Sequence, residues 1–173
     1  MWAKHKQSGF TIVELLIVIV VIAILAAITI VAFNGIQSRA KNQQTVAAVR
    51  AYYTALKAYA VDTGALPTST GCLGVSSFYD SNPCYIGANT YNYNSALNNA
   101  LLPYMNNNQP SLPTGRIVSG SNSSSGIFYY PSGSYIAFPM FASSTCPTIA
   151  GSTLDSSVAF GSDIFCRIKF PEV

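Results

Sequence analysis

Charged side chains are scarce in this sequence of 173 residues, since Asp, Glu, Lys and Arg together make up only 9%. The formal net charge at pH 7 is +3. A domain that holds nucleic acid through its phosphates is usually far more basic. A nucleic-acid partner is therefore possible but is not supported by the charge. A polar surface with few charges has little self-repulsion, which suits dense packing beside copies of itself.

Histidine is nearly absent, since His5 is the only one. Without a histidine later in the chain, no histidine-based triad or proton relay can be built. No phosphate-binding loop motif is present. The later carboxylates are scattered along the chain, at Asp62, Asp80, Asp155, Asp163 and Glu172. A calcium site at Asp155 and Asp163 is an alternative to ordinary loop acids. The sequence predicts no enzyme and no cofactor.

Cysteine is limited to four residues, Cys72, Cys84, Cys146 and Cys166. None of them form a Cys-x-x-Cys motif, so we expect no zinc or other metal site. An even number of cysteines in a translocated domain favours two disulfides. Three pairings are possible, and we expect the local one, Cys72–Cys84 with Cys146–Cys166. Four reduced, buried thiols are the alternative.

Proline is missing between Met1 and Leu66, and the segment from Phe10 to Phe33 is almost wholly apolar. Its only charge is Glu14, and Thr11 and Thr29 are its only other polar side chains. As a helix it would be roughly 36 Å long, enough to cross a hydrocarbon core of about 30 Å. Lipid favours a helix here because the backbone must satisfy its own hydrogen bonds. Lys4, His5 and Lys6 precede the segment, which predicts a cytoplasmic N-terminus and an external remainder.

Glu14 is unusual because a carboxylate inside a membrane helix costs up to ~3 kcal/mol, and less near the interface. One interpretation is that Glu14 is solvated at headgroup level. The other interpretation is that Glu14 pairs with a cation. Cleavage between Gly9 and Phe10 would create an α-amino group four residues before Glu14, on the same helical face. Such an amine is mostly charged, and the helix dipole opposes it. A carboxylate from a neighbouring chain would relieve both unfavourable charges.

The basic segment that ends in Gly9, the motif Phe10-Thr11-Ile12-Val13-Glu14 and the apolar run after it resemble the class III signal of type IV pilins and pseudopilins. The resemblance implies cleavage after Gly9 by a prepilin peptidase, N-methylation of Phe10 and assembly into a helical filament. In the family, the glutamate at the position of Glu14 contacts the amino terminus of an adjacent subunit. Loss of the leader would remove two lysines and lower the net side-chain charge from +3 to +1.

The chain divides by composition into five expected segments. These are a cleaved leader (1–9), a transmembrane or filament-core helix (10–33), an amphipathic half of the same helix (34–63), a helix-to-sheet connection (64–115) and an antiparallel sheet with a C-terminal disulfide region (116–173). Asn34-Gly35 permits a bend, a local unwinding or an uninterrupted helix. Gly64 and Pro67 are expected to end the helix. Core contacts are expected from a three-four stripe formed by Val46, Val49, Tyr53, Leu56 and Ala60.

The rest of the chain carries strand and turn signals. Strands are expected at 116–119, 126–130, 135–141 and 157–170, with a turn at 120–125. A short helix is expected at 95–105, capped by Ser95. The predicted fold is α+β and type IV pilin-like, with a long helix under an antiparallel sheet of about four strands. Asn122-Ser123-Ser124 is a possible glycosylation sequon.

Three functions fit this pattern. The first is a structural subunit, a major pilin, of a type IV pilus. It would be a single-pass membrane protein before assembly, with its C-terminal domain outside, and would then join an extracellular filament. Its partners would be copies of itself, the prepilin peptidase/N-methyltransferase and the membrane assembly machinery. The second is a pseudopilin of a type II secretion or DNA-uptake system. The third is a conventional secreted or membrane-anchored adhesin. Three cations of the amphipathic half allow three interpretations: a solvated helix face, a DNA-binding surface or pairing with acidic residues of another subunit. These cations are Lys41, Arg50 and Lys57.

Overall fold

The computed structural model describes residues 10–81 and 84–171 of the chain. These residues fall into two compact units, Met1–Gln37 and Ser38–Val173, which we call the N-terminal unit and the head unit. The expected leader, with Gly9, lies outside the described residues. The boundary at Ser38 is close to the point where the apolar run gives way to an amphipathic pattern.

The first helix, α1, runs over Ile12–Thr63 and is assigned without a break through Asn34 and Gly35. The interpretation of Asn34-Gly35 as a local unwinding is therefore not seen. The helix ends as the sequence predicts. Gly64 has a φ of 82°, a value that glycine adopts without strain, and its N–H donates to the carbonyl of Ala60 over 2.9 Å.

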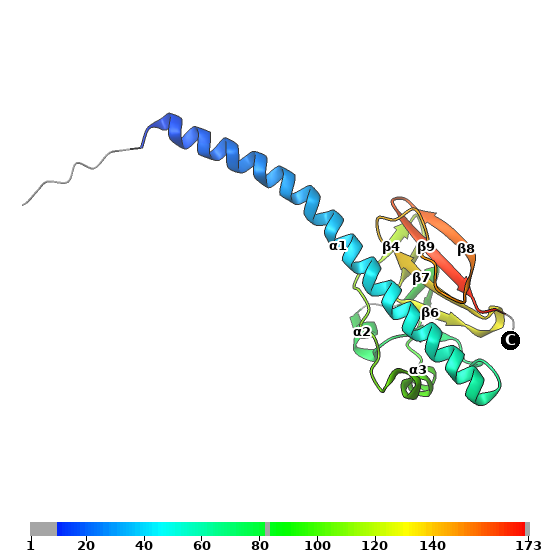
Figure 1. The fold of residues 1–173 in the computed structure, drawn as a ribbon. Helices are drawn as coiled ribbons and strands as arrows, with labels where there is room; N and C mark the ends of the chain where they lie inside the picture. Colours follow the sequence, from blue (N-terminus) through cyan, green and yellow to red (C-terminus); the bar gives the residue numbers. More distant parts are fainter. Residues whose placement is uncertain (1–9, 82–83, 172–173) are drawn as a thin grey trace, which may run out of the picture. The chain divides into compact units, whose positions relative to one another are not determined.

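The head unit contains two antiparallel sheets (Figure 1). The larger has the order β1-β6-β7-β9-β8 and the smaller has the order β3-β2-β5-β4. The strands of the larger sheet are, in that order, Gly71–Leu73, Ile127–Tyr130, Tyr135–Met140, Asp163–Lys169 and Thr153–Phe160. Those of the smaller are Asn89–Tyr91, Cys84–Gly87, Asn122–Ser125 and Ile117–Ser119. The predicted α+β class with a long N-terminal helix is confirmed.

The described residues form nine strands where about four were expected, because the segment 64–115 and the expected turn at 120–125 also supply strands and one predicted strand belongs to a hairpin. The run 157–170 is a hairpin of β8 and β9, with Gly161 at φ 66° as the first residue of its turn. The expected turn 120–125 is instead a two-residue turn that begins at Gly120, with a φ of 58°, followed by β5, which forms a second hairpin with β4. Glycine at this position is typical of two-residue hairpin turns. Serine-rich β5 lacks the residues that usually signal a strand.

The segment 64–115 is more ordered than a connection. It supplies three of the strands and two helices, α2 (Ser76–Ser81) and α3 (Ser95–Leu101), the latter followed by the 3-10 turn η1 (Leu102–Met105). A second 3-10 turn, η2, spans Pro131–Gly133. The expected helix at 95–105 is present, but its cap is Asn94 and not Ser95. The side chain of Asn94 accepts a hydrogen bond from Leu97 N over 3.0 Å.

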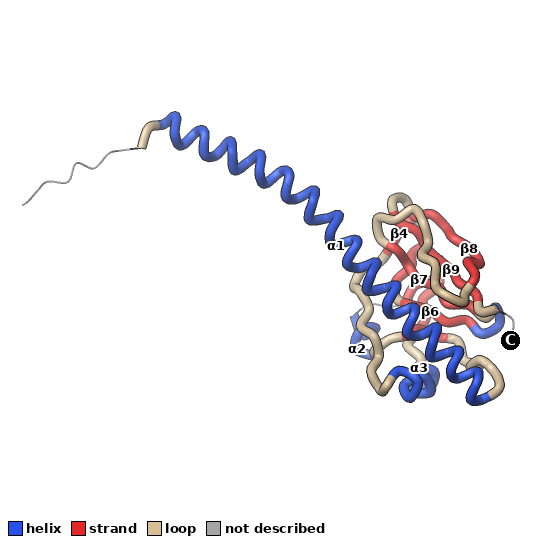
Figure 2. The backbone as a smooth tube through the Cα atoms, viewed as in Figure 1, coloured by secondary structure: helices blue, strands red, loops and turns tan. Residues whose placement is uncertain are grey.

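The core of the head unit lies between its part of α1 and the larger sheet, which Figure 2 shows beside one another in blue and red. Four residues of the expected stripe are buried: Val49, Tyr53, Leu56 and Ala60. Val46 is only half-buried. Tyr52 and Ala55 are fully buried as well, so the buried face of the helix is wider than one stripe. From the sheet, alternate residues of β9 contribute Ile164, Cys166 and Ile168.

Candidate functional site

The N-terminal unit presents apolar side chains to its surroundings. Large hydrophobic residues from Phe10 to Ile36 are exposed, with Ile17 at 58% and Leu25 at 57%. Of the helices in the described residues, α1 alone is long and apolar enough to cross a membrane. Such a surface needs lipid or other apolar helices around it, because it gains nothing by facing water.

Glu14 lies in the first turn of α1 and is bound to Thr11. Its Oε2 accepts hydrogen bonds from Thr11 N over 2.9 Å and from Thr11 Oγ1 over 2.8 Å. In return, Glu14 N donates to Thr11 Oγ1 over 3.2 Å. The first helical bond runs from Leu15 N to Thr11 O over 3.3 Å. Thr11 is therefore the N-cap and Glu14 the third helical residue of a capping box.

This geometry corrects one expectation. Phe10 and Thr11 precede the helix, so Phe10 and Glu14 do not share a helical face. The carboxylate instead turns back towards the start of the chain, where the backbone N–H of Thr11 holds it. An amine from another chain would therefore approach a carboxylate whose Oε2 already accepts two hydrogen bonds from Thr11. The pattern Thr-x-x-Glu before an apolar run is the sequence signal that would have predicted this cap.

The head unit holds two disulfides, Cys72–Cys84 and Cys146–Cys166, and no free cysteine among the described residues. These are the pairs that sequence proximity favours. The first joins β1 of the larger sheet to β2 of the smaller one. The second ties the loop before β8 to β9. Both bridges therefore fix segments that backbone hydrogen bonding alone would leave separate.

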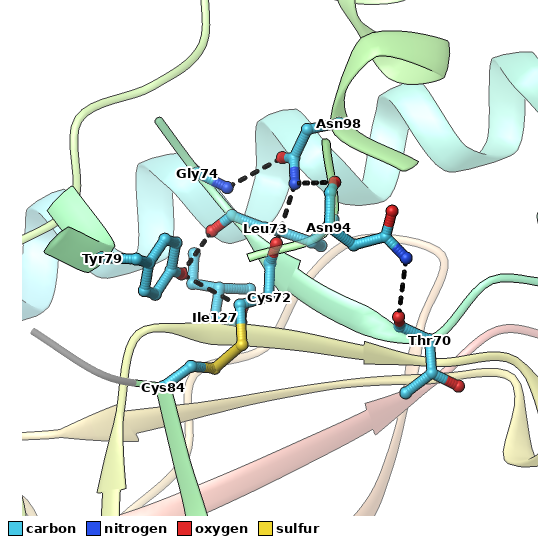
Figure 3. The surroundings of a disulfide bond; sticks show 9 residues. All are labelled: Thr70, Cys72, Leu73, Gly74, Tyr79, Cys84, Asn94, Asn98 and Ile127. Atoms are coloured by element: carbon cyan, nitrogen blue, oxygen red, sulfur yellow. Dashed lines mark hydrogen bonds between the residues drawn. A yellow bond between two sulfur atoms is a disulfide. The ribbon is translucent and has the colours of Figure 1, made fainter. Parts of the chain in front are cut away.

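Asn98 satisfies the backbone beside the first disulfide (Figure 3). Its side chain is fully buried. Its Nδ2 donates to the carbonyls of Cys72 and Asn94, each over 2.8 Å. Its Oδ1 accepts from Gly74 N over 2.9 Å and from Gln109 Nε2 over 3.2 Å. All four hydrogen-bonding positions of the amide are used, so Asn98 stabilises the region around β1. Nothing in the sequence pattern distinguishes this asparagine from its neighbours.

Comparison with known proteins shows which family the N-terminal part of the chain resembles. A family model described as the prokaryotic N-terminal methylation motif matches residues 4–30. The competence protein ComGC of Halalkalibacterium halodurans is 30% identical over 80 residues, which cover 46% of this chain and 78% of that protein. The chain belongs to the type IV pilin and pseudopilin family.

Two further relatives show the breadth of this family. A type II secretion system core protein G of Aeromonas hydrophila is 36% identical over 66 residues, 38% of this chain and 46% of that protein. A fimbrial protein of Neisseria meningitidis is 31% identical over 80 residues, 46% of this chain and 47% of that protein. The chain thus spans about half the length of these two relatives. No solved structure matches.

Members of the pilin and pseudopilin family are structural subunits and not enzymes. They assemble into filaments with membrane machinery. The described residues contain no group of three or more potential metal-binding side chains. Asp155 pairs with Arg167, and Asp163 Oδ1 accepts a hydrogen bond from Ala142 N over 2.7 Å. These acids therefore have structural partners in the chain.

Asn122 of this pilin-family chain is exposed, at the start of β5. Its sequon hydroxyl belongs to Ser124, which is fully buried and has no hydrogen-bond partner. Ser124 lies opposite Ile117 in β4 and Ile86 in β2. An enzyme that must reach both ends of the sequon would find only the asparagine accessible in the folded head unit. This geometry favours modification of Asn122 only before β5 has folded.

Proposed function

We propose that the chain is the major subunit of a type IV pilus. It enters the membrane as a precursor, is cleaved after Gly9 by a prepilin peptidase and is methylated on the new amino group of Phe10. It then polymerises through its apolar N-terminal helix. The mature subunit resides in an extracellular filament made of copies of itself.

The observation that carries this proposal is the pairing of an exposed apolar helix with one capped carboxylate. Apolar helices in a bundle specify their axial register poorly, because one isoleucine or valine contact resembles the next. Glu14 is the exception within residues 10–33. A misplaced neighbour would leave an amine and a carboxylate unpaired in a low-dielectric core, which is costly. One charge pair per subunit can therefore set the register.

The orientation in the membrane follows from the flanking charges. Lys4 and Lys6 precede the apolar run, and positively charged flanks tend to stay in the cytoplasm. The head unit would then fold outside, where disulfides persist. The two cystines of the head unit support this orientation.

A pseudopilin is the second candidate, because the relatives include a type II secretion system core protein and a competence protein. Both candidates share cleavage, methylation and a helical core. They differ in the filament, since a pilus extends from the cell and a pseudopilus does not. The number of long filaments that shearing releases from cells therefore separates them.

The experiment that tests the proposal is to shear cells that produce the full chain and to examine the released material. Electron microscopy should show long filaments. Intact-mass analysis of their subunit should show loss of residues 1–9 and one added methyl group. A mature terminus near Ala26 or Ala27 would instead indicate an ordinary secretory signal and would overturn the proposal. Correct cleavage without long filaments would favour the pseudopilin.

A further inference from the structure

Most charged side chains of the head unit have a partner within the chain. Four of its cations lie on an aromatic ring or a carboxylate: Lys41 on Phe141, Lys57 on Tyr53, Arg116 on Tyr85, and Arg167 on both Tyr135 and Asp155. Three acids are also engaged: Asp62 with Tyr104, Asp155 with Arg167 and Asp163 with Ala142 N. Within residues 38–81 and 84–171, Asp80 is the one carboxylate that has no such partner.

Arg50 is an exposed cation that also lacks a partner in the described chain. It stands on α1 at the edge of a groove lined by Tyr53, Thr54, Thr148, Ile149 and Ala150. The far wall of the groove is the loop between β7 and β8. This loop is held by the Cys146–Cys166 bridge, by the buried side chain of Ile149 and by a hydrogen bond from Tyr53 Oη to Gly151 O. The groove is therefore a fixed feature of the fold.

Asp80 stands on α2, where Ser76 and Ser77 are exposed beside it. The same short helix is anchored from below by Tyr79, whose hydroxyl donates to Leu73 O over 2.7 Å. The exposed face of α2 is thus a polar surface with one negative charge, and Tyr79 attaches the helix to β1. This surface is small enough to fit into a groove, and its negative charge is complementary to the positive charge of Arg50.

These two surfaces lie towards opposite sides of the larger sheet. Strand β1 and then α2 stand at one edge, and the loop that walls the groove is tied to β9, three strands away in the order β1-β6-β7-β9. At about 4.8 Å per strand, this separates them by roughly 14 Å of sheet alone. Figure 1 shows α2 and β8 on opposite sides of α1 within the head unit. Arg50 and Asp80 form no ion pair within one chain, and the surfaces that carry them lie several strands apart.

We propose that the Arg50 groove of one copy binds the Asp80 face of α2 on the next copy. The guanidinium and the carboxylate make a charge-assisted pair, and the hydroxyls of Ser76 and Ser77 face Thr54 and Thr148. A contact between two different surfaces of the same molecule is heterologous, so it repeats from copy to copy and forms an open array. The inference rests on the proposed filament function and adds a head-to-head contact to the helical core.

The test is a charge swap measured by the yield of sheared filaments. Arg50→Asp and Asp80→Arg should each lower the yield by about tenfold or more, because each brings like charges together. The double variant restores the pair in reverse and should recover most of the yield. Arg39→Asp makes the same charge change at an exposed cation away from the groove and should assemble normally. An equal loss in Arg39→Asp, or no recovery in the double variant, would overturn the inference.

Cross-linking gives a second readout. A chain carrying both Thr54→Cys and Ser77→Cys should form a ladder of covalent oligomers in sheared filaments under oxidising conditions. Either cysteine alone should give no ladder, because the contact brings unlike sites together and each chain then carries only one added thiol. Monomers only from the double-cysteine chain, in filaments that assemble normally, would refute the contact. In that case the proposed filament function would stand, whereas absence of filaments from the unaltered chain would remove the function itself.

Discussion

Thr11 and Glu14 hold each other at the start of α1 through three hydrogen bonds of 2.8 to 3.2 Å. A capping interaction of this kind contributes about 1 kcal/mol to a helix. Glu14 therefore has two roles. It caps its own helix in the free chain, and in the proposed filament it must also face a neighbouring amine.

Substitutions can separate the cap from the charge. Glu14→Gln keeps a side chain that can accept the Thr11 N–H, but it loses the negative charge. Thr11→Ala loses the cap and keeps the charge. If the charge sets the helix register, Glu14→Gln and Glu14→Ala should both reduce sheared filament yield strongly, by about tenfold or more. Thr11→Ser, which retains the hydroxyl, should assemble like the unaltered chain.

The measurement compares sheared filaments with the total membrane-bound subunit in the same cells. Cleavage and head folding should be unchanged in every variant, since Glu14 lies outside the head unit. Normal yield from both Glu14 variants would show that the carboxylate is only solvated at the membrane interface. Helix packing alone would then set the register.

Asn98 gives the clearest stability prediction for the head unit. Asn98→Ala would leave the carbonyl of Cys72 and the N–H of Gly74 buried without their present partner. An unsatisfied buried polar group costs about 1–3 kcal/mol, so a loss of roughly 2–4 kcal/mol in the free energy of unfolding is expected. Chemical denaturation of the disulfide-bonded protein measures this loss.

Two variants control for the chemistry of the Asn98 change. Asn98→Asp keeps the size but replaces two donors with an acceptor, so it should be at least as destabilising as Asn98→Ala. Asn108→Ala makes the same change at an exposed site and should stay within about 0.5 kcal/mol of the unaltered chain. Equal stabilities for Asn98→Ala and Asn108→Ala would contradict the role assigned to the Asn98 network.

The sequence predicts well those features that depend on long apolar runs and on strong helix signals. The end of α1 at Thr63, the helix near Ser95 and the buried positions Val49, Leu56 and Ala60 were all predictable, because periodicity and capping residues act locally. Strand β5 was not predictable, since its Asn-Ser-Ser-Ser sequence has low strand propensity. It is a strand because β2 and β4 pair with it on both sides.

The functional residues show the same contrast between features that a local pattern predicts and features that depend on distant segments. Glu14 is conspicuous as a lone charge in an apolar run, but its present partner, Thr11, follows from a capping rule that needs only four residues. Asn98 and the Arg50 groove depend on segments far apart in the chain. Residues 72, 74, 98 and 109 meet only after β1 and α3 have packed together. No local sequence pattern predicts these contacts.

The buried tyrosines predict how stability falls in alkali. Burial raises the pKa of Tyr129 to about 12, and it raises those of Tyr52 and Tyr79 further. The folded head unit therefore binds these phenolic protons more tightly than the unfolded chain does, where the pKa is near 10. The resulting stability is complete below pH 10 and is lost as the pH rises towards 12.

The denaturation midpoint should thus be nearly constant up to about pH 9 and should fall between pH 10 and 12. Tyr129→Phe removes one of these ionising groups together with the hydrogen bond from Tyr129 Oη to Pro67 O. It should lower stability at neutral pH and make the alkaline fall shallower. A flat profile through pH 12 would show that the phenols ionise without cost in the folded protein.

The disulfide pairs can be read directly by non-reducing peptide mapping of the mature protein. Cys72 should be linked to Cys84, and Cys146 to Cys166. Each bridge closes a short loop and should contribute about 3 kcal/mol. Reduction should therefore weaken the head unit severely. Crossed links would contradict the assigned contact between the two sheets and the anchoring of the loop beside Arg50.

The last prediction is that a chain beginning at Ser38 folds on its own as a soluble protein. The head unit contains its own core, a buried cluster that includes Tyr52 and Leu56 of α1 together with Ile136 and Phe138 of β7. Among the residues that the structure describes, this core includes none that precedes Val46. With both disulfides formed, the truncated chain should give well-dispersed NMR signals and a cooperative unfolding transition. Poorly dispersed signals from the oxidised protein would show that the head unit needs the N-terminal unit, and the division at Ser38 would then be wrong.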